Sequence, residues 1–448
     1  MLRFAVALLA FGSVLAQQGP PPQVRAAIQS VEGMLEGTDD ASLKSFADEH
    51  LSPAYRASFG PDALMAHLKS LRAAVGGQIG GLRVERAEDG LRLMIQGAKE
   101  ATFALKLDDA GRVALLDLVP GEAKPPSPEA AIFEKTTWES LSSDLAKFAD
   151  TGFSGVVLAR RDGKEVLRSS YGLADRAGGR HTAGDTIYCI GSTPIDFTMT
   201  GILLLGQRGQ LGLDDPVAKF IPGVPDDKKA MTIRQLMSGK SGLPNFHHIE
   251  GKDWDADLAW IDRETAVRRI LSQPLLFAPG AGEAHSHSAF VLLAAVIESI
   301  TKTSYQGFVR GEILKPLGMA RTGFYGESLK LDASQFAVGY GASSVGVPNI
   351  PPNWGPVSWL VMGSGGMFST LDDMDRYDAA IASGKLLTGP WAKWQQGQQA
   401  NAGGSDRGFF IFHVTNGRGT EVLFLMNGEG RAAGARAMTR AMEKLVNS

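Results

Sequence analysis

The apolar positions in the first part of the chain change from a helical period to a strand-like one. Residues 24–35 and 61–75 carry apolar side chains three and four positions apart, which predicts amphipathic helices. Between residues 82 and 115 apolar and polar side chains alternate, with turn sequences at 89–90 and 109–111. The pattern predicts a small α+β domain at residues 23–119. Its alternating positions are Leu82/Val84, Leu91/Leu93/Ile95, Phe103/Leu105/Leu107 and Val113/Leu115.

A stiff polar segment follows this domain. The sequence PGEAKPPSP, from Pro120 to Pro128, has no apolar face, and its prolines restrict the backbone. Residues 120–129 are therefore interpreted as an interdomain linker, and residues 130–448 as a second, larger domain.

The second domain combines strands near both of its ends with a helical middle. The predicted strands are 154–159, 165–169, 408–414 and 420–425. The predicted helices are 130–148, most of 192–314, and 432–446. Each strand pair surrounds a turn sequence, Arg161-Asp162-Gly163 in the first and Asn416-Gly417 in the second. A sheet assembled from both ends makes this segment one α/β (α+β) domain with an antiparallel sheet flanked by helices.

Composition and charge restrict the choice of partner. The 448 residues are 44% hydrophobic and 21% charged, and the formal net charge is -3. No run of five or more lysines and arginines occurs, so the chain lacks the electrostatic footprint of a protein that binds nucleic acid or an anionic membrane. These features favour a small-molecule or peptide-like ligand. No pattern in the sequence specifies an oligomeric state.

The N-terminus has the pattern of a secretory signal peptide, predicted at residues 1–16. Arg3 supplies the positive charge, residues 4–15 the apolar core, and Val14-Leu15-Ala16 the cleavage pattern. The apolar stretch is shorter than the roughly 20 residues that a spanning helix needs. The only cysteine is Cys189, so none follows the cleavage site to accept a lipid, and no intrachain disulfide can form. We therefore expect a secreted or periplasmic protein with no membrane anchor after signal cleavage.

Ser192 stands at the start of a strongly apolar helical segment. A serine that follows a small residue at a helix start exposes its hydroxyl where the helix dipole favours negative charge, as a nucleophile requires. The same residues also fit an ordinary helix start, with Thr193 as N-cap, Pro194 at the first position and Asp196 at the third. The segment by itself leaves both interpretations open.

The surrounding segments resemble the serine β-lactamase and penicillin-binding-protein family, in its class C-like and esterase-like branch. They lie between about Ser154 and Asn427 and read, in order, IGSTPIDFT, GQLGLDDPV, MTIRQLMSGKSGLPNF, PLLFAPGAGEAHSHSAFVLLAAVIE, LKPLGMARTGF, AVGY and GSGGMFSTLDDMDRY. The resemblance implies a β-lactamase/transpeptidase-like fold, with a site between the sheet and the helical region. It also implies acylation of Ser192 by an amide or ester, without a cofactor or a metal.

The sequence departs from the family at the S-x-x-K motif. Ser192 matches the serine, but Ile195 occupies the position of the lysine. Residues three apart share a helix face, so a lysine there can handle the serine's proton, whereas isoleucine cannot. Loss of such a group costs about 10²- to 10⁴-fold in rate. Asp196 points about 100° away on the helix and is not expected to replace the lysine.

The family's Y-x-N motif falls on His285-Ser286-His287. A histidine within reach of Ser192 would be a general base near neutral pH, giving a Ser-His dyad, with His287 at the asparagine position. The alternative is a loop in which neither imidazole is oriented, since no acidic partner for His285 is evident. A metal site made of both histidines with His247-His248 is not favoured, because no carboxylate or cysteine falls at ligand spacing.

The family's third motif, a K/H-T/S-G triplet on the strand beside the serine, has a weak counterpart at Asn401-Ala402-Gly403-Gly404. The backbone N–H of Gly403 or Gly404 could join that of Ser192 in an oxyanion hole. The glycines could equally be no more than a turn.

Two functional hypotheses follow from these departures. In the first, the protein is a catalytically impaired or inactive member of the family that binds a ligand or partner in its cleft. In the second, it is a serine hydrolase (an esterase, a peptidase or an enzyme of β-lactam-type acyl transfer), with Ser192 as nucleophile and His285 as base.

Overall fold

The computed structural model of the protein describes most of the chain. The described residues are 22–37, 39–76, 79, 81–87, 90–96, 100–119, 128–246, 259–327, 329–341, 344–396, 401–428 and 433–448. The predicted signal peptide at 1–16 and residues 120–127 of the predicted linker lie outside them. The chain divides into two compact units, Met1–Pro125 and Pro126–Ser448, and each is described by itself.

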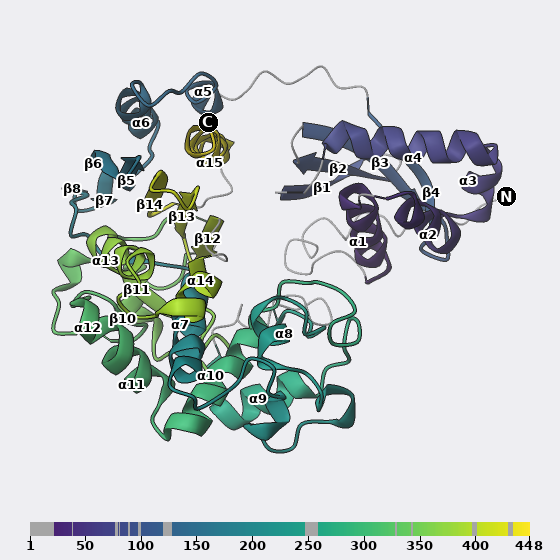
Figure 1. Cartoon of the computed structure of the whole chain (residues 1–448). Helices are drawn as coiled ribbons and strands as arrows, with labels where there is room; N and C mark the ends of the chain where they lie inside the picture. Colours follow the sequence, from purple (N-terminus) through teal and green to yellow (C-terminus); the bar gives the residue numbers. More distant parts are fainter. Residues whose placement is uncertain are drawn as a thin grey trace. The chain divides into compact units, whose positions relative to one another are not determined.

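Helices and an antiparallel sheet make up the described part of the N-terminal unit (Figure 1). The helices are α1 (Pro22–Glu36), α2 (Asp40–His50), α3 (Pro53–Ala57) and α4 (Pro61–Val75). The strands, adjacent in chain order, are β1 (Gly81–Ala87), β2 (Gly90–Gln96), β3 (Glu100–Leu107) and β4 (Val113–Leu118). The predicted helices and alternating strands are confirmed. Every second side chain points to one face, so Leu93, Phe103 and Leu105 are buried together with Leu68 of α4.

The C-terminal unit is built on an antiparallel sheet whose strand order is β12-β13-β14-β5-β6. Its strands are β5 (Gly155–Arg161), β6 (Lys164–Tyr171), β12 (Asn401–Asp406), β13 (Phe409–Thr415) and β14 (Glu421–Met426). The predicted assembly of one sheet from both ends of the segment is confirmed, because β14 pairs with β5. The short strands β7 (Leu173–Asp175) and β8 (Arg180–His181) pair separately, and β9 (Tyr188–Cys189), β10 (Gly323–Phe324) and β11 (Met367–Ser369) form a small sheet in the order β10-β11-β9.

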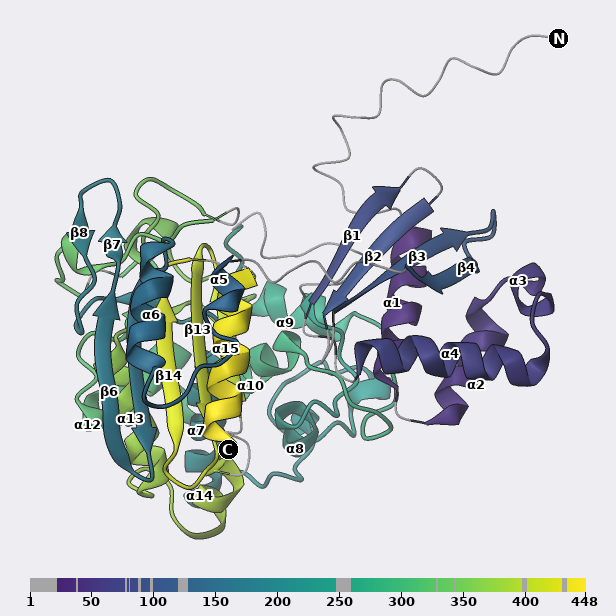
Figure 2. The same ribbon diagram turned by 90° about the horizontal axis from the view of Figure 1, so that it is seen from above.

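Helices cover both faces of the large sheet (Figure 2). On one face α5 (Pro128–Ala131), α6 (Leu141–Asp150) and α15 (Ala433–Val446) lie against side chains such as Val157 and Phe424. The opposite face, which includes Leu158 and Leu425, packs against the helical region. The helices of that region are α7 (Pro194–Gln207), α8 (Ile233–Met237), α9 (Arg263–Leu271), α10 (His287–Thr301), α11 (Tyr305–Val309), α12 (Lys315–Leu317), α13 (Leu371–Ala382) and α14 (Gly389–Gln396).

One predicted element of the C-terminal unit differs from the structure, and an open alternative is decided. The predicted helix 130–148 is interrupted between α5 and α6, where Thr136 and Ser140 donate hydrogen bonds to Asp144 Oδ2 at 3.0 Å and 2.7 Å. Such side-chain bonds compete with a continuous helix. For residues 401–404 the sequence left open the strand beside the serine or a turn, and the structure forms strand β12, in which all six residues pair with β13.

No helix in the described part of the chain is both long and apolar enough to cross a membrane.

Candidate active site

Ser192 lies in a tight turn between strand β9 and helix α7. Strand β9 is held in place by β11, with Cys189 opposite Phe368, and Ile190 N–H donates to Met367 O at 3.1 Å. Gly191 adopts a φ of 51°, a left-handed conformation that side chains disfavour. The turn leaves Ser192 partly exposed while both of its neighbours are buried. A serine hydroxyl is thus presented at the start of a buried helix.

The predicted helix start is confirmed. Thr193 is the N-cap of α7, Pro194 is in the first turn, and Asp196 is the acidic residue of that turn. Thr193 forms no side-chain capping hydrogen bond. The helix start therefore depends on proline and on tertiary packing more than on the N-cap side chain.

Strand β12 passes directly beside the serine. A Cβ at Gly404 would lie 2.3 Å from Ser192 N, so only a glycine fits against this backbone nitrogen. Gly404 is one of the two glycines considered from the sequence, and the absence of a side chain there makes room for Ser192; Gly403 precedes it on the same strand. This close approach of two backbones is the frame that an oxyanion hole requires.

The position three residues after the serine carries no proton-handling group. Ile195 is partly buried and packs against the main hydrophobic core of the unit. Within the described residues, Ser192 Oγ forms no hydrogen bond. The structure therefore presents a serine without a base bonded to it.

The two histidines lie at the start of α10. Ser286 is the N-cap, and Ser286 and Ser288 donate hydrogen bonds to Pro244 O at 3.3 Å and 2.8 Å. His287 is buried with its ring 5.7 Å from that of Phe246.

The ring of His285 is exposed and meets the ring of His287 edge-on at 4.9 Å. No hydrogen bond joins His285 to Ser192 in the described part of the chain. His247 and His248, considered for a metal site, lie outside the described residues, within which no group of three or more potential metal ligands gathers.

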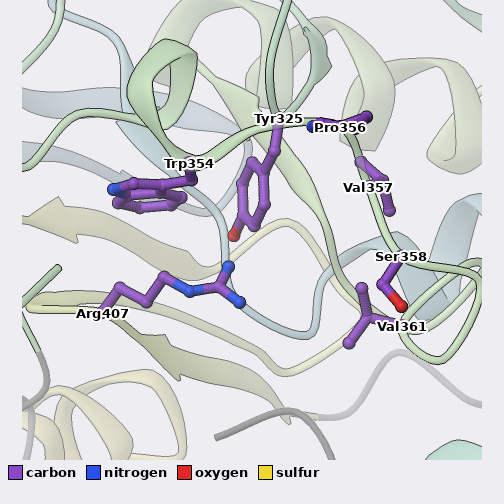
Figure 3. Close-up of a pocket in the computed structure, with 7 residues that line it drawn as sticks. All are labelled: Tyr325, Trp354, Pro356, Val357, Ser358, Val361 and Arg407. Atoms are coloured by element: carbon purple, nitrogen blue, oxygen red, sulfur yellow. The ribbon is translucent and has the colours of Figure 1, made fainter. Parts of the chain in front are cut away.

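A small pocket opens beside the serine turn (Figure 3). Tyr325 stands in its wall, and its hydroxyl lies 2.7 Å from the sulfur of Cys189, three residues before the serine. Val361 also lines the pocket. Gly365 lies between Val361 and the serine turn: a Cβ built on it would be 3.8 Å from Val361 Cβ and 3.5 Å from Gly191 O. The full lining is Tyr325, Trp354, Pro356, Val357, Ser358, Val361 and Arg407.

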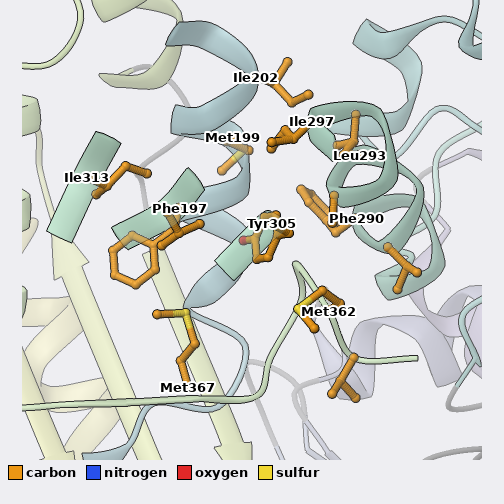
Figure 4. Packing of buried hydrophobic residues seen from close by; sticks show 14 of the residues in the cluster. Phe197, Met199, Ile202, Phe290, Leu293, Ile297, Tyr305, Ile313, Met362 and Met367 are labelled. Atoms are coloured by element: carbon orange, nitrogen blue, oxygen red, sulfur yellow. The ribbon is translucent and has the colours of Figure 1, made fainter. Parts of the chain in front are cut away.

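A buried polar junction joins α7 to the loop before β11. Thr198 Oγ1 donates to Gly363 O at 2.6 Å and lies 2.6 Å from the hydroxyl of Tyr305. The apolar side chains of α7 and α10 interlock around this junction, with Phe197, Met199 and Phe290 in view (Figure 4). The packing fixes the helix that follows the Ser192 turn relative to the helix that begins at His287.

A group of partly buried charged side chains lies between α13 and the large sheet. His413 on β13 lies with Nδ1 3.5 Å from Asp378 Oδ2 and Nε2 3.1 Å from Glu421 Oε2. Arg160 on β5 continues the group, 2.6 Å from Glu421 and 2.7 Å from Asp375. Buried charges are tolerated when each is paired in this way.

Asp196 lies near enough to this charged group for its carboxyl to respond to the charges of Asp378 and His413. Burial and the nearby carboxylate of Asp378 raise the pKa of Asp196 to about 7, against the attraction of His413. Burial also raises the pKa of Asp378 to about 6. Burial lowers the pKa of His413, but Asp378 and Glu421 outweigh it and raise this pKa to about 9. The protonation of Asp196 is therefore coupled to the charges of Asp378 and His413.

Sequence comparison assigns the larger unit to a family. The Beta-lactamase family model matches residues 141–446, more than half of the chain. The chain belongs to the β-lactamase family. Within this family it is similar to penicillin-binding protein 4* of Bacillus subtilis (strain 168), at 29% identity over 238 residues, covering 51% of this chain and 52% of that protein. Esterase EstB of Burkholderia gladioli is 30% identical over 235 residues, covering 47% of this chain and 58% of the esterase. The chain thus spans about half the length of these curated relatives.

Solved structures share the β-lactamase-family fold. The D-amino acid amidase from Ochrobactrum anthropi SV3 complexed with L-phenylalanine aligns with a TM-score of 0.57 and 22% identity, covering 69% of this chain and 97% of the amidase. The octameric penicillin-binding protein homologue from Pyrococcus abyssi aligns with a TM-score of 0.56 and 21% identity, covering 67% and 76%. The predicted antiparallel sheet flanked by helices is confirmed as the fold of the larger unit.

The group around His413 was not found from the sequence. His413 and Glu421 occupy ordinary alternating positions of two strands, and Asp378 lies on a helix with several other acids. These residues come together because α13 packs across the sheet. The local sequence pattern does not predict how the helix crosses the strands.

Proposed function

We propose that this β-lactamase-family protein is catalytically impaired and uses the cleft beside Ser192 to bind a small-molecule or peptide-like ligand. The observation that carries the proposal is Ile195, a partly buried apolar side chain packed against the core at the position where the family's S-x-x-K motif has its lysine. A serine hydroxyl without a positioned base is a weak nucleophile at neutral pH. The expected loss of rate is about 10²- to 10⁴-fold.

A second candidate function is supported by the contact between Gly404 and Ser192 N. This contact retains the frame of an oxyanion hole, which by itself contributes a large part of acyl-transfer catalysis. In this alternative the protein is a serine hydrolase in which His285, an exposed residue of the α10 entry loop, moves to Ser192 when substrate binds.

The two candidates differ in what happens to Ser192 in the presence of an activated acyl compound. We would incubate the protein with a p-nitrophenyl ester, a chromogenic β-lactam and a fluorophosphonate, and follow turnover and the intact mass. Impairment predicts no turnover above that of Ser192→Ala and no stable adduct on Ser192. Turnover that is abolished by both Ser192→Ala and His285→Gln would instead establish the hydrolase.

Restoration of the amine gives a complementary test. Ile195→Lys places an ammonium or amine group on the serine's helix face, and it should raise ester turnover or acylation by about 10-fold or more over the unmodified protein. Ile195→Met, which keeps the apolar character and a similar length, is the matched control and should have no effect. Equal rates for the lysine and methionine variants would argue against Ile195 as the cause of impairment.

We further propose that the protein is exported and acts outside the cytoplasm. The support is the signal-peptide pattern of residues 1–16. Mass spectrometry of the mature protein should find a chain that begins near Gln17. A mature chain that retains Met1 would contradict export by this route.

A further inference from the structure

The first turn of α7 links the reactive serine to an acidic side chain, Asp196. Ile195 N donates to Ser192 O at 3.1 Å, and Asp196 N donates to Thr193 O at 2.9 Å. Each of these backbone bonds spans three residues, so the serine turn and the helix start form one hydrogen-bonded segment. Because the side chain of Thr193 forms no capping bond, this segment depends on what packs beneath it.

The carboxyl group of Asp196 has no direct partner. Asp196 is partly buried, and within the described residues its side chain forms neither a hydrogen bond nor an ion pair. The charge of Asp378 opposes its ionisation, and the charge of His413 favours it. A carboxylate that is withdrawn from water without a hydrogen bond is costly, whereas the protonated form is tolerated. Asp196 therefore suits its surroundings better when it is protonated.

Helices α13 and α14 meet the face of α7 that carries Asp196. Thr200, one turn further along this face, has its Oγ1 2.7 Å from the hydroxyl of Tyr377 on α13 and 2.6 Å from Gln395 Nε2 on α14. Burial and then the charge of Asp196 raise the pKa of Tyr377 well above its ordinary value, so this hydroxyl stays neutral. Asp378 is the next residue of α13. Among the described residues of these two helices, none contributes a positive charge that favours ionisation of Asp196.

Strand β13 supplies the cation that acts on Asp196, His413. Its Nδ1 lies 3.5 Å from Asp378 Oδ2 and its Nε2 3.1 Å from Glu421 Oε2 on β14, and Glu421 also pairs with Arg160 on β5. Burial lowers the pKa of His413, but Asp378 and Glu421 outweigh it, so the imidazolium persists at neutral pH. Because two carboxylates already share this cation, it compensates an ionised Asp196 only in part.

Helix α7 and the sheet also meet at the serine. Gly404 of β12 lies against Ser192 N and pairs with Ile411 of β13, and His413 is two residues further along β13. Ser192 and Asp196 are separated by about one helical turn. The serine side and the sheet side of the contact thus each carry one member of the pair Asp196 and His413. A change in how Asp196 fits against the sheet is transmitted to the contact between Ser192 and Gly404, because the same backbone segments carry both pairs.

We propose that Asp196 is a pH switch for the serine turn. The turn stays closed against β12 while Asp196 is protonated, and it opens more often when Asp196 is ionised. This behaviour is independent of whether the cleft binds a ligand or turns one over.

The direction of the switch follows from the proton balance. Burial and Asp378 raise the pKa of Asp196 from 3.8 to about 7 in the closed turn. An open turn returns the carboxyl group to water and to its ordinary pKa, so opening releases a proton above about pH 4. The closed turn is therefore favoured fully below about pH 4, loses this advantage as the pH rises to about 7, and changes little beyond it.

The chain contains its own reporter of the serine turn. Cys189 is the only cysteine, is completely buried on β9, and accepts a hydrogen bond on its sulfur from Gly191 N at 3.4 Å. A thiol in this position reacts with a reagent in solution only when the turn opens. Labelling by dithiodipyridine, which reacts with thiols in acid as well as at neutral pH, measures this opening. Division by the labelling rate of the same protein unfolded in urea at each pH removes the pH dependence of the thiol itself.

The test compares the unmodified protein with the Asp196→Asn variant. We expect the protection of Cys189 in the unmodified protein to fall about 10-fold or more between about pH 5 and pH 7.5, and that in Asp196→Asn to fall less than about 3-fold. Asp226→Asn is the matched control, because this carboxylate of the same unit is 92% exposed, and it should behave like the unmodified protein. Asp378→Asn removes the charge that opposes ionisation of Asp196, so its fall should be smaller, and it provides the comparison if Asp196→Asn does not fold.

A second reporter separates opening of the turn from unfolding of the whole unit. Ala435 is completely buried on α15, which covers the other face of the large sheet. A thiol placed there by Ala435→Cys, in a chain that also carries Cys189→Ala, should keep its protection between the two pH values. A parallel loss at both positions would mean global unfolding and would overturn the proposal. An equal loss of Cys189 protection in the unmodified protein and in Asp196→Asn would also overturn it, as would a Cys189 that stays unlabelled through pH 7.5.

The switch and the proposed function fail independently, because thiol labelling requires neither a ligand nor turnover. Turnover of esters would contradict catalytic impairment and leave the switch intact. A serine turn whose opening does not change with pH would remove the switch and leave the consequence of Ile195 as it stands.

Discussion

Gly404 on strand β12 lies directly against the backbone nitrogen of Ser192, at a separation that would place a Cβ 2.3 Å from that nitrogen. The contact sets the distance between the edge of the large sheet and the first turn of α7. It also keeps the backbone of β12 close enough to the serine to share an oxyanion with it. The close approach of these two backbones is therefore present, whereas the side chain at position 195 is apolar.

A methyl group at position 404 should disturb this contact. Gly404→Ala forces either β12 or the serine turn to move, because the clash is with backbone and not with a flexible side chain. We expect a loss of about 1–3 kcal/mol in the free energy of unfolding. Chemical denaturation would measure it, with Gly184→Ala as control, since a Cβ at Gly184 meets nothing within 4 Å. Equal stability of the two variants would be inconsistent with the contact.

The charged group beneath α7 predicts a pH dependence of stability. The pKa of Asp196 is raised from 3.8 to about 7 in the folded protein, so the folded state binds an extra proton between these values. The stability that Asp196 contributes is therefore complete below about pH 4 and is lost as the pH rises through 7.

Asp196→Asn should remove this part of the pH dependence. The variant is expected to match the unmodified protein near pH 4 and to be more stable at pH 8, by an amount on the order of 2 kcal/mol. Urea denaturation at a series of pH values would show it, with the exposed Asp109→Asn as control. A variant that is less stable at pH 8 would mean that the charged form of Asp196 is favoured inside the protein.

The polar junction of Thr198 should contribute strongly because it is fully buried. Thr198→Val keeps the shape but leaves Gly363 O and the hydroxyl of Tyr305 without this partner, at a cost of about 1–3 kcal/mol. Tyr305→Phe in the same chain removes one of the orphaned groups, so the double variant should lose less than the sum of the two single changes. Thermal unfolding of the four proteins would reveal the coupling, and strict additivity would argue that the two hydroxyls do not interact.

The two units should unfold separately, because their buried apolar clusters share no residue. Leu68→Ala in the N-terminal unit and Ile202→Ala in the C-terminal unit each remove a fully buried side chain, at an expected cost of about 2–5 kcal/mol. Each change should lower only the transition of its own unit in a calorimetric scan, and residues 126–448 produced alone should keep the second transition. If both changes lowered a single common transition, the units would be one cooperative domain.

Local pattern was sufficient for elements that carry their own signal. The helix at 61–75 and the hairpin around Asp162-Gly163 follow from apolar spacing and from residues that accept a positive φ. By contrast, β12 consists largely of small and polar residues and becomes a strand only because β13 supplies its hydrogen bonds. The break between α5 and α6 depends on side-chain bonds to Asp144 that apolar spacing does not register.

The sequence by itself determined the fold family, the place of Ser192 at a helix start and the absence of a lysine at position 195, because these depend on residue identity and short-range spacing. Only the tertiary structure decided that Gly404 touches Ser192, that the charges of Asp378 and His413 act on Asp196, and that Arg407 lies against Tyr325 and Trp354. These partners are distant in sequence, and they meet because burial of the sheet and of α7 brings their backbones together.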